Sequence, residues 1–196
     1  MSKVRLIVKT QYRELIRAYR PKDEMDHQVK ENMLSLLKQH GDTLLTRENP
    51  IAHMTASSVI INEERTKMLM IHHKIYDTWT WQGGHTDGEE DLLKVALKEA
   101  EEETGLKNFK VLENEEGFIR KLDILTVKAH FKNGKPITAH LHLNAAFLLE
   151  AKEEDTLLQN KDETNGIRWV PVSEIDALAK EPEITPIYHD LIRRAK

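Results

Sequence analysis

The chain of 196 residues contains no cysteine. This absence excludes disulfides, thiolate zinc sites, iron–sulfur clusters and a cysteine nucleophile. The sequence also lacks an apolar run of the ~18–20 residues that a membrane span requires. The first apolar run stops after Val8, which leaves no signal-peptide core. We therefore expect a cytoplasmic protein without a membrane partner.

Excess positive charge is missing as well, because the net charge is −4 and the pI is about 6.2. No basic field draws such a chain to nucleic acid, so no nucleic-acid partner is expected. The negative charge is concentrated in one segment. Residues 87–103 hold eight acidic and two basic side chains, a net charge of −6. This segment is the first indication of a functional site.

The hydrophobic pattern predicts one α/β domain with an addition at its N-terminus. Residues 1–48 carry apolar residues at helical spacing, with Pro21 between two helices and Gly41 after the second. Strand-like runs then surround one strong helix at 89–104, and helices end the chain. This order predicts a mixed sheet with helices on both faces. We expect an N-terminal helical extension, residues 1–48, packed on a core domain of residues 49–196.

The helix predicted at 89–104 changes character along its length. One of its faces is apolar in the first half, at Leu92, Val95 and Ala96. The same face continues into carboxylates in the second half, at Glu99, Glu102 and Glu103. These acids repel one another, and they lie near the negative end of the helix dipole. A local conflict of this kind often marks a functional site.

Two explanations of these carboxylates stay open from the residues alone. The first is a solvated acidic helix. The second is a site for a hard divalent cation, because clustered carboxylate oxygens suit Mg²⁺ or Mn²⁺. Three glycines in residues 83–88 precede the helix, so backbone N–H groups can approach an anion there.

Residues 84–106 resemble the Nudix box, Gly-x5-Glu-x7-Arg-Glu-U-x-Glu-Glu-x-Gly-U, where U is a bulky aliphatic residue. The matching positions are Gly84, Glu90, Glu99, Glu102, Glu103, Gly105 and Leu106. Two positions depart from the box, since Lys98 replaces the arginine and Ala100 replaces a larger aliphatic residue. Gln82 also stands where the family has proline before the two glycines.

The resemblance implies a Nudix-type α/β/α sandwich and metal-dependent hydrolysis of a nucleoside diphosphate linked to another moiety. It implies metal ligands at Glu99, Glu102 and Glu103, joined by the carbonyl of Gly83. It also implies that Lys98 positions Glu99 less firmly than arginine does, because lysine lacks the planar fork. The cofactor expected is Mg²⁺, with Mn²⁺ as the alternative.

Many members of the family use a further acid before a late tryptophan-containing strand. Glu163 is our choice, because the segment KDETNGIRW resembles that loop. Either Glu99 or Glu163 is expected to deprotonate the attacking water. The competing explanation is a solvated loop acid. The competing residues are Glu150, Glu153, Glu154, Asp155 and Asp162.

Five further residues are candidates for contacting a small nucleotide-type substrate. His140 and His142 point to one face of a strand, where they line the pocket, pack beside it or bind metal. His85 follows the glycines and is either a substrate contact or a plain loop residue. Trp79 either stacks on a base or belongs to the core. Arg120 is either a phosphate partner or a solvated arginine.

Alternative functions also stay open. A nucleotide-sensing module on the same fold would bind its ligand without turnover, and Lys98 and Gln82 mildly favour it. An isomerase acting on an isoprenyl diphosphate is disfavoured because the family branch with that chemistry uses cysteine. A decapping role is disfavoured by the local acidity. The apolar stripes within residues 1–48 indicate packing on the fold, a homodimer contact or a lid over the pocket.

Overall fold

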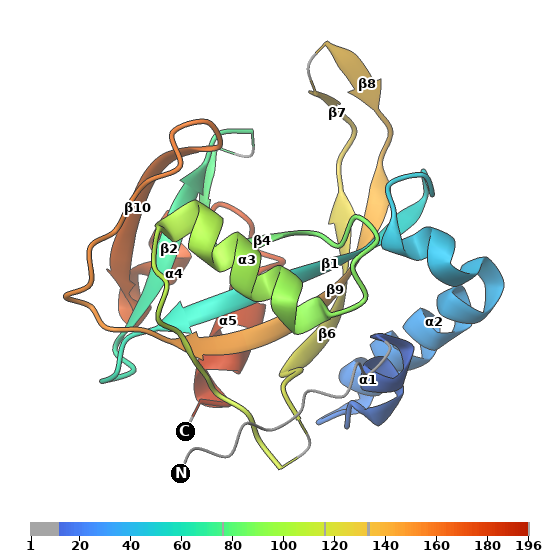
Figure 1. Ribbon diagram of the computed structural model, residues 1–196, viewed down its shortest axis with the longest axis horizontal. Coiled ribbons are helices and arrows are strands. Elements are labelled where there is room, and N and C mark those ends of the chain that lie inside the picture. Colours follow the sequence, from blue (N-terminus) through green and yellow to red (C-terminus); the bar gives the residue numbers. More distant parts are fainter. Residues whose placement is uncertain (1–11, 76, 116, 133, 196) are drawn as a thin grey trace.

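The computed structural model describes residues 12–75, 77–115, 117–132 and 134–195, with helices on both sides of an eight-stranded sheet (Figure 1). The helices are α1 (Tyr12–Ala18), α2 (Glu24–His40), α3 (Leu92–Thr104), α4 (Ile175–Leu178) and α5 (Thr185–Arg193), with 3-10 turns at Gly41–Leu45 and Val172–Glu174. The strands are β1 (Ala52–Ile61), β2 (Lys67–His73), β3 (Thr78–Thr80), β4 (Gln82–His85), β5 (Lys110–Val111), β6 (Lys121–Val127), β7 (His130–Lys132), β8 (Lys135–Ile137), β9 (His140–Glu150) and β10 (Thr164–Pro171). The expected mixed sheet between helices is confirmed.

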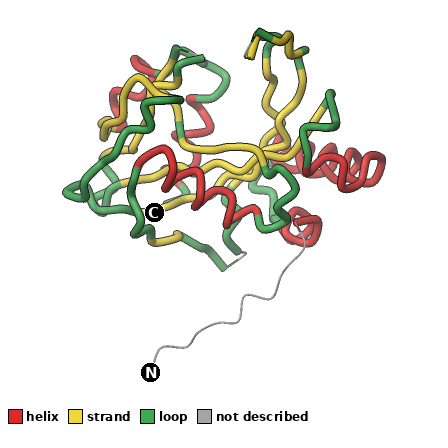
Figure 2. The backbone as a smooth tube through the Cα atoms, turned by 45° about the horizontal axis from the view of Figure 1, so that its top comes forward, coloured by secondary structure: helices red, strands yellow, loops and turns green. Residues whose placement is uncertain are grey.

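The sheet is organised around one parallel pair, β1 and β9. The strand order is β10-β2-β1-β9-β5, and β3, β4 and β6 pair with β2, β1 and β9 respectively. The pairing of β1 with β9 is parallel and runs from Ala52↔Leu141 to Ile61↔Glu150, whereas β4 is antiparallel to β1. Every residue of β1 is buried, as expected for a strand that is covered on both faces. Strands β7 and β8 form a separate hairpin that projects from the body of the molecule (Figure 1 and Figure 2).

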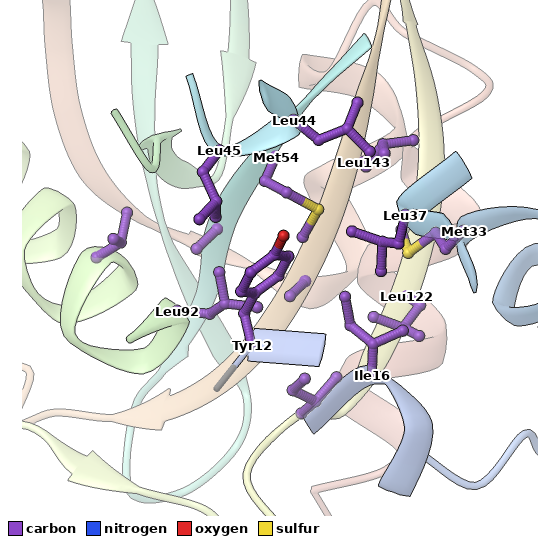
Figure 3. Packing of buried hydrophobic residues seen from close by; sticks show 14 of the residues in the cluster. Tyr12, Ile16, Met33, Leu37, Leu44, Leu45, Met54, Leu92, Leu122 and Leu143 are labelled. Atoms are coloured by element: carbon purple, nitrogen blue, oxygen red, sulfur yellow. The ribbon is translucent and has the colours of Figure 1, made fainter. Parts of the chain in front are cut away.

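The two faces of the sheet pack against different helices. Residues Met54 and Ala56 of β1 belong to a core that includes side chains of α1, α2 and α3. Figure 3 shows this core, with Tyr12 and Ile16 of α1 close to the sheet. Because side chains alternate along a strand, Val59 and Ile61 face the other way and pack with α4 and α5.

A buried ionic cluster links the N-terminal helices to the rest of the chain. Asp26 of α2 is fully buried, and its carboxylate pairs with Lys121 of β6 and, at 2.9 Å, with Arg194 after α5. The hydroxyl of Tyr19 donates to the same carboxylate at 2.8 Å. Burial alone would raise the pKa of Asp26, but the hydrogen bonds from Lys121, Tyr19 and Arg194 outweigh it and lower the pKa to about 2.

The segment after α2 also holds the loop that precedes α3. The carbonyl of Leu45 accepts hydrogen bonds from the Thr86 hydroxyl and from the Gly88 N–H, both at 2.8 Å. Arg47 forms a two-pronged ion pair with Asp87 at 2.8 and 2.6 Å. Residues 45–47 therefore fix the loop at the entrance to α3.

The structure corrects the expected start of the acidic helix. Helix α3 begins at Leu92 rather than at residue 89, because Asp91 is its N-cap and accepts from the Lys94 N–H at 3.0 Å. None of the described helices is long and apolar enough to cross a membrane.

Candidate active site

Two glycines of β4 let a helix and a strand approach closely. A Cβ atom on Gly83 would lie 2.4 Å from the Ser57 hydroxyl oxygen, and a Cβ atom on Gly84 would lie 2.4 Å from the carboxyl carbon of Glu99. Neither distance is possible for a real side chain. The missing side chain of Gly84 therefore lets Glu99 of α3 lie directly against β4, and that of Gly83 lets β4 lie close to Ser57 of β1.

The second half of α3 directs two carboxylates at Gly83 and Gly84 of β4 and one carboxylate away from them. Glu103 is 4% exposed and accepts a hydrogen bond from the Gly83 N–H at 3.1 Å. Glu99 lies against Gly84, and its side chain is 18% exposed. The side chain of Glu102 is 53% exposed and pairs with Lys98 at 3.0 Å. Of the three glutamates predicted as metal ligands, the structure thus brings Glu99 and Glu103 together and leaves Glu102 at the rim.

Burial and the neighbouring acids disfavour the ionised forms of Glu99 and Glu103. Burial raises the pKa of Glu103 to about 8; the Gly83 N–H opposes this, while the charges of Glu99, Glu163 and Glu102 add to it. Burial likewise raises the pKa of Glu99, and Lys98 opposes that shift.

Glu163 lies close enough to this pair to act on it electrostatically. It is exposed, immediately precedes β10, and its charge raises the pKa of both Glu99 and Glu103. Two competing acids are occupied elsewhere, since Glu150 pairs with Lys110 at 2.7 Å and Glu153 pairs with Lys67. The geometry therefore favours Glu163 as the acid from outside the α3 segment.

The remaining matched positions shape the ends of α3. Glu90 is exposed in the turn before the helix. Gly105 ends the helix with a φ of +74°, and a Cβ atom there would lie 2.5 Å from the Cβ of Leu158. Lys98 reaches Glu102 more closely than Glu99, at 3.0 against 3.5 Å. Gln82 is fully buried and donates to the Leu69 carbonyl at 3.2 Å.

The three candidate histidines lie together, and a fourth joins them. The Nε2 atoms of His85 and His53 are 3.0 Å apart, and the ring centroid of His142 lies 4.8 Å from that of His85. The ring centroid of His140 is 4.7 Å from that of His53. His53 was not among the predicted site residues; it lies near the start of β1, which begins at Ala52.

The two other candidates differ in their surroundings. Trp79 is half-buried on β3, with the Arg168 guanidinium 4.6 Å from its ring centroid and His72 at its edge. Arg120 is 7% exposed, and its guanidinium donates to the carbonyls of Leu112 and Arg194. Trp79 thus packs against the core while staying partly exposed, and Arg120 holds the C-terminal segment.

Comparison with known proteins now settles the family. The family profile of the NUDIX domain matches residues 52–191, which is most of the chain and includes the whole carboxylate site. The chain belongs to the Nudix hydrolase family. Nudix enzymes generally use divalent metals, which fits a site where Glu99, Glu102 and Glu103 end one helix.

Individual relatives support the assignment. The chain is 32% identical over 114 residues to the rat bis(5'-nucleosyl)-tetraphosphatase [asymmetrical], a match that covers 58% of this chain and 66% of that protein, just under two thirds of its length. It is 25% identical over 130 residues to a probable DHNTP pyrophosphohydrolase of Lactococcus lactis, covering 64% of this chain and 70% of that one.

Solved structures share the fold of this Nudix protein. The dihydroneopterin triphosphate pyrophosphohydrolase of E. coli superposes with a TM-score of 0.56 at 15% identity, over 72% of this chain and 95% of that chain. A binary complex of a C. elegans Ap4A hydrolase gives a TM-score of 0.54 at 18% identity, over 72% and 96%. At these identities the similarity shows the Nudix fold alone.

Proposed function

We propose that this Nudix protein hydrolyses a phosphoanhydride bond in a nucleoside diphosphate linked to another moiety, with Mg²⁺ as its metal. The observation that carries the proposal is the convergence of Glu99 and Glu103 on Gly83 and Gly84 of β4. Burial raises the pKa of both acids, and the charge of Glu99 raises that of Glu103 further, so a bound cation would stabilise the pair.

The residues present fit a hard divalent ion. Glu99 and Glu103 offer carboxylate oxygens, Glu102 lies at the rim, and Glu163 lies close enough to raise the pKa of both inner acids. Such all-oxygen sets suit Mg²⁺ or Mn²⁺ rather than a soft metal. When bound, the ion neutralises phosphate oxygens and makes a water molecule easier to deprotonate.

Residues of this chain hold the carboxylates in position and provide the base that deprotonates the attacking water. The Gly83 N–H holds one oxygen of Glu103 at 3.1 Å, and the absence of a side chain on Gly84 fixes where Glu99 can lie. Either Glu99 or Glu163 takes the proton of the attacking water. Attack on one phosphorus then releases a nucleoside monophosphate and a phosphorylated remainder.

The substrate class is proposed from Trp79 and from the relatives. The half-buried ring of Trp79, held by Arg168 at 4.6 Å, offers a surface on which a nucleobase stacks. The relatives' names refer to a bis(5'-nucleosyl) tetraphosphate and to dihydroneopterin triphosphate, both carrying several linked phosphates. We therefore place dinucleoside polyphosphates and nucleoside triphosphates first in the set to be tried.

The proposal is tested by turnover of a panel of nucleotide sugars, dinucleoside polyphosphates and nucleoside triphosphates with Mg²⁺ or Mn²⁺. Glu103→Gln should lower kcat by about 10²–10³-fold, because one preorganised charge at the reacting centre is worth that much. The matched control is Glu101→Gln, an exposed residue of the same helical turn. Full activity in Glu103→Gln contradicts the mechanism, and ligand binding without turnover by the wild-type chain indicates a nucleotide-sensing module instead.

A further inference from the structure

Four histidines, His53, His85, His140 and His142, gather where β1, β4 and β9 meet. In the parallel pair, His53 of β1 is directly opposite His142 of β9. In the antiparallel pair, His85 of β4 is opposite Thr55, two residues along β1 from His53. Because side chains alternate along a strand, this register places all three rings on one face of the sheet.

That face is not the one that carries the carboxylates. Ala56 is opposite Gly84, which touches Glu99 of α3, and Ala56 packs in the core beneath α3. His53 and His85 have the opposite parity, so they point away from α3. The histidine cluster therefore lies on the opposite face of the sheet from the carboxylates and is a separate site. We use this name for His53, His85 and His142.

The spacing within the histidine cluster suits one shared ion. Each residue offers a ring nitrogen, and these atoms all lie within 4.8 Å of one another. The Nε2 atoms of His53 and His85 are 3.0 Å apart, close to the roughly 3.3 Å expected for two nitrogens on a tetrahedral ion with bonds of about 2.0–2.1 Å. The ring centroids lie 4.8, 5.2 and 4.8 Å apart, so all three rings surround one point.

Two further observations point to a ligand at this place. The Nε2 atom of His142 is buried without a hydrogen-bond partner among the described residues, which is costly for a polar atom. On the far side of the His53 ring, Nδ1 lies 3.3 Å from the Asn49 carbonyl. A backbone carbonyl behind a ring is the usual support of a metal-binding histidine, because it fixes the tautomer that leaves Nε2 free.

We propose that His53, His85 and His142 bind a transition-metal ion of the Zn²⁺ class, separately from the carboxylate site. Imidazole nitrogens suit such ions, whereas Mg²⁺ takes oxygen ligands. Three protein ligands leave a fourth position for water or an outside ligand. The ion would join β1, β4 and β9 immediately beside Gly83 and Gly84.

The test is Zn²⁺ binding to the full-length chain, measured by calorimetry with Mg²⁺ held at saturation so that the carboxylates are occupied. We expect one Zn²⁺ per chain, and loss of that binding step in His85→Gln and in His142→Gln. The control variant is His27→Gln, an exposed histidine of α2, which should bind Zn²⁺ as the wild type does. Zn²⁺ binding that is unchanged in His85→Gln overturns the proposal.

A second measurement does not depend on the folding of a variant. Crystals of the wild-type chain grown with Mg²⁺ and soaked in Zn²⁺ should show an anomalous peak at the zinc edge between the three imidazoles. A peak at Glu99 and Glu103 alone, or no peak, overturns the proposal. Glu103→Gln should keep the peak at the histidines, which separates this site from the proposed catalytic metal.

Discussion

The protein buries carboxylates in two regions and treats them in opposite ways. Asp26, between the N-terminal helices and the sheet, is fully buried and has a pKa lowered to about 2. Glu103, at the end of α3, is 4% exposed and has a pKa raised to about 8. Burial acts in the same direction on both groups, so the neighbours make the difference. Asp26 has two cations and a hydroxyl, whereas Glu103 has other acids.

The comparison distinguishes a structural carboxylate, Asp26, from a carboxylate that we propose binds a metal ion, Glu103. A buried acid surrounded by donors is satisfied by the protein itself and stabilises one arrangement of its elements. A buried acid surrounded by acids is satisfied only when a cation arrives, and until then it lowers stability. The four predictions below break or sharpen this difference.

The largest expected effect is a loss of stability when Asp26, the acid with cationic partners, is replaced. Asp26→Asn leaves Lys121 and Arg194 without their shared counter-charge in a buried place. Breaking a buried pair in this way costs about 3–5 kcal/mol of the free energy of unfolding. Urea unfolding measures it. The control is Asp42→Asn, because Asp42 pairs with Arg13 at 2.6 Å but is 72% exposed, and such pairs contribute about 0–1 kcal/mol. Equal losses in the two variants would contradict the role given to the buried cluster.

The next effect is on acid stability. The pKa of Asp26 is lowered from 3.8 to about 2, so the folded state binds this proton less readily than the unfolded state does. The stabilisation is therefore present above pH 4 and is lost as the pH falls toward 2. It amounts to roughly 2 kcal/mol by linkage. Unfolding experiments between pH 5 and pH 2 should show a steeper fall in wild type than in Asp26→Asn. Parallel curves would show that other acids govern the transition.

A smaller effect on stability, a gain instead of a loss, is expected when Glu103 is replaced. Glu103→Gln removes an acid whose ionisation the folded state opposes, since its pKa is raised to about 8, so it should stabilise the metal-free protein by about 1 kcal/mol. The sign follows from linkage: charging of this group opposes folding as the pH rises from about 4.5 toward 8, so the gain grows over that range. Thermal unfolding with and without Mg²⁺ measures it, and Mg²⁺ should raise the Tm of wild type more than that of the variant. A variant less stable than wild type at pH 8 would contradict this view of the site.

The sequence predicted the carboxylate region better than the other two buried polar regions. The change from apolar to acidic residues along one helix is a local pattern, and it predicted Glu99, Glu102 and Glu103 on one inward face. Glu99 and Glu103 lie against β4, whereas Glu102 is 53% exposed and pairs with Lys98.

The Asp26 cluster and the histidine cluster could not be predicted from the sequence, because both depend on contacts between residues far apart in the chain. The Asp26 cluster joins residues of α2, β6 and the segment after α5. The histidine cluster depends on the register of β1 against β9 and of β1 against β4. The H-x-H spacing of His140 and His142 predicted a shared face correctly, but no local pattern indicated that His53 lies opposite His142.

The smallest expected effect concerns the residue that departs from the family pattern. Lys98 contacts Glu102 at 3.0 Å and Glu99 at only 3.5 Å, so its single ammonium group holds the inward glutamate loosely. The planar fork of arginine can donate to both carboxylates at once. Lys98→Arg should therefore raise kcat by about two- to fivefold, the worth of one hydrogen bond of about 0.5–1 kcal/mol, with little change in KM.

The matched control for this change is Lys94→Arg, one turn earlier on the same exposed side of α3, where the partner is Glu89 rather than a glutamate of the site. That variant should leave kcat unchanged, because its ion pair does not reach Glu99. If both variants raise kcat equally, the gain comes from the general charge of the helix surface. If only Lys98→Arg raises kcat, then the side chain at position 98 determines how firmly Glu99 is held. The carboxylate site and the Asp26 cluster then differ in rigidity as well as in charge.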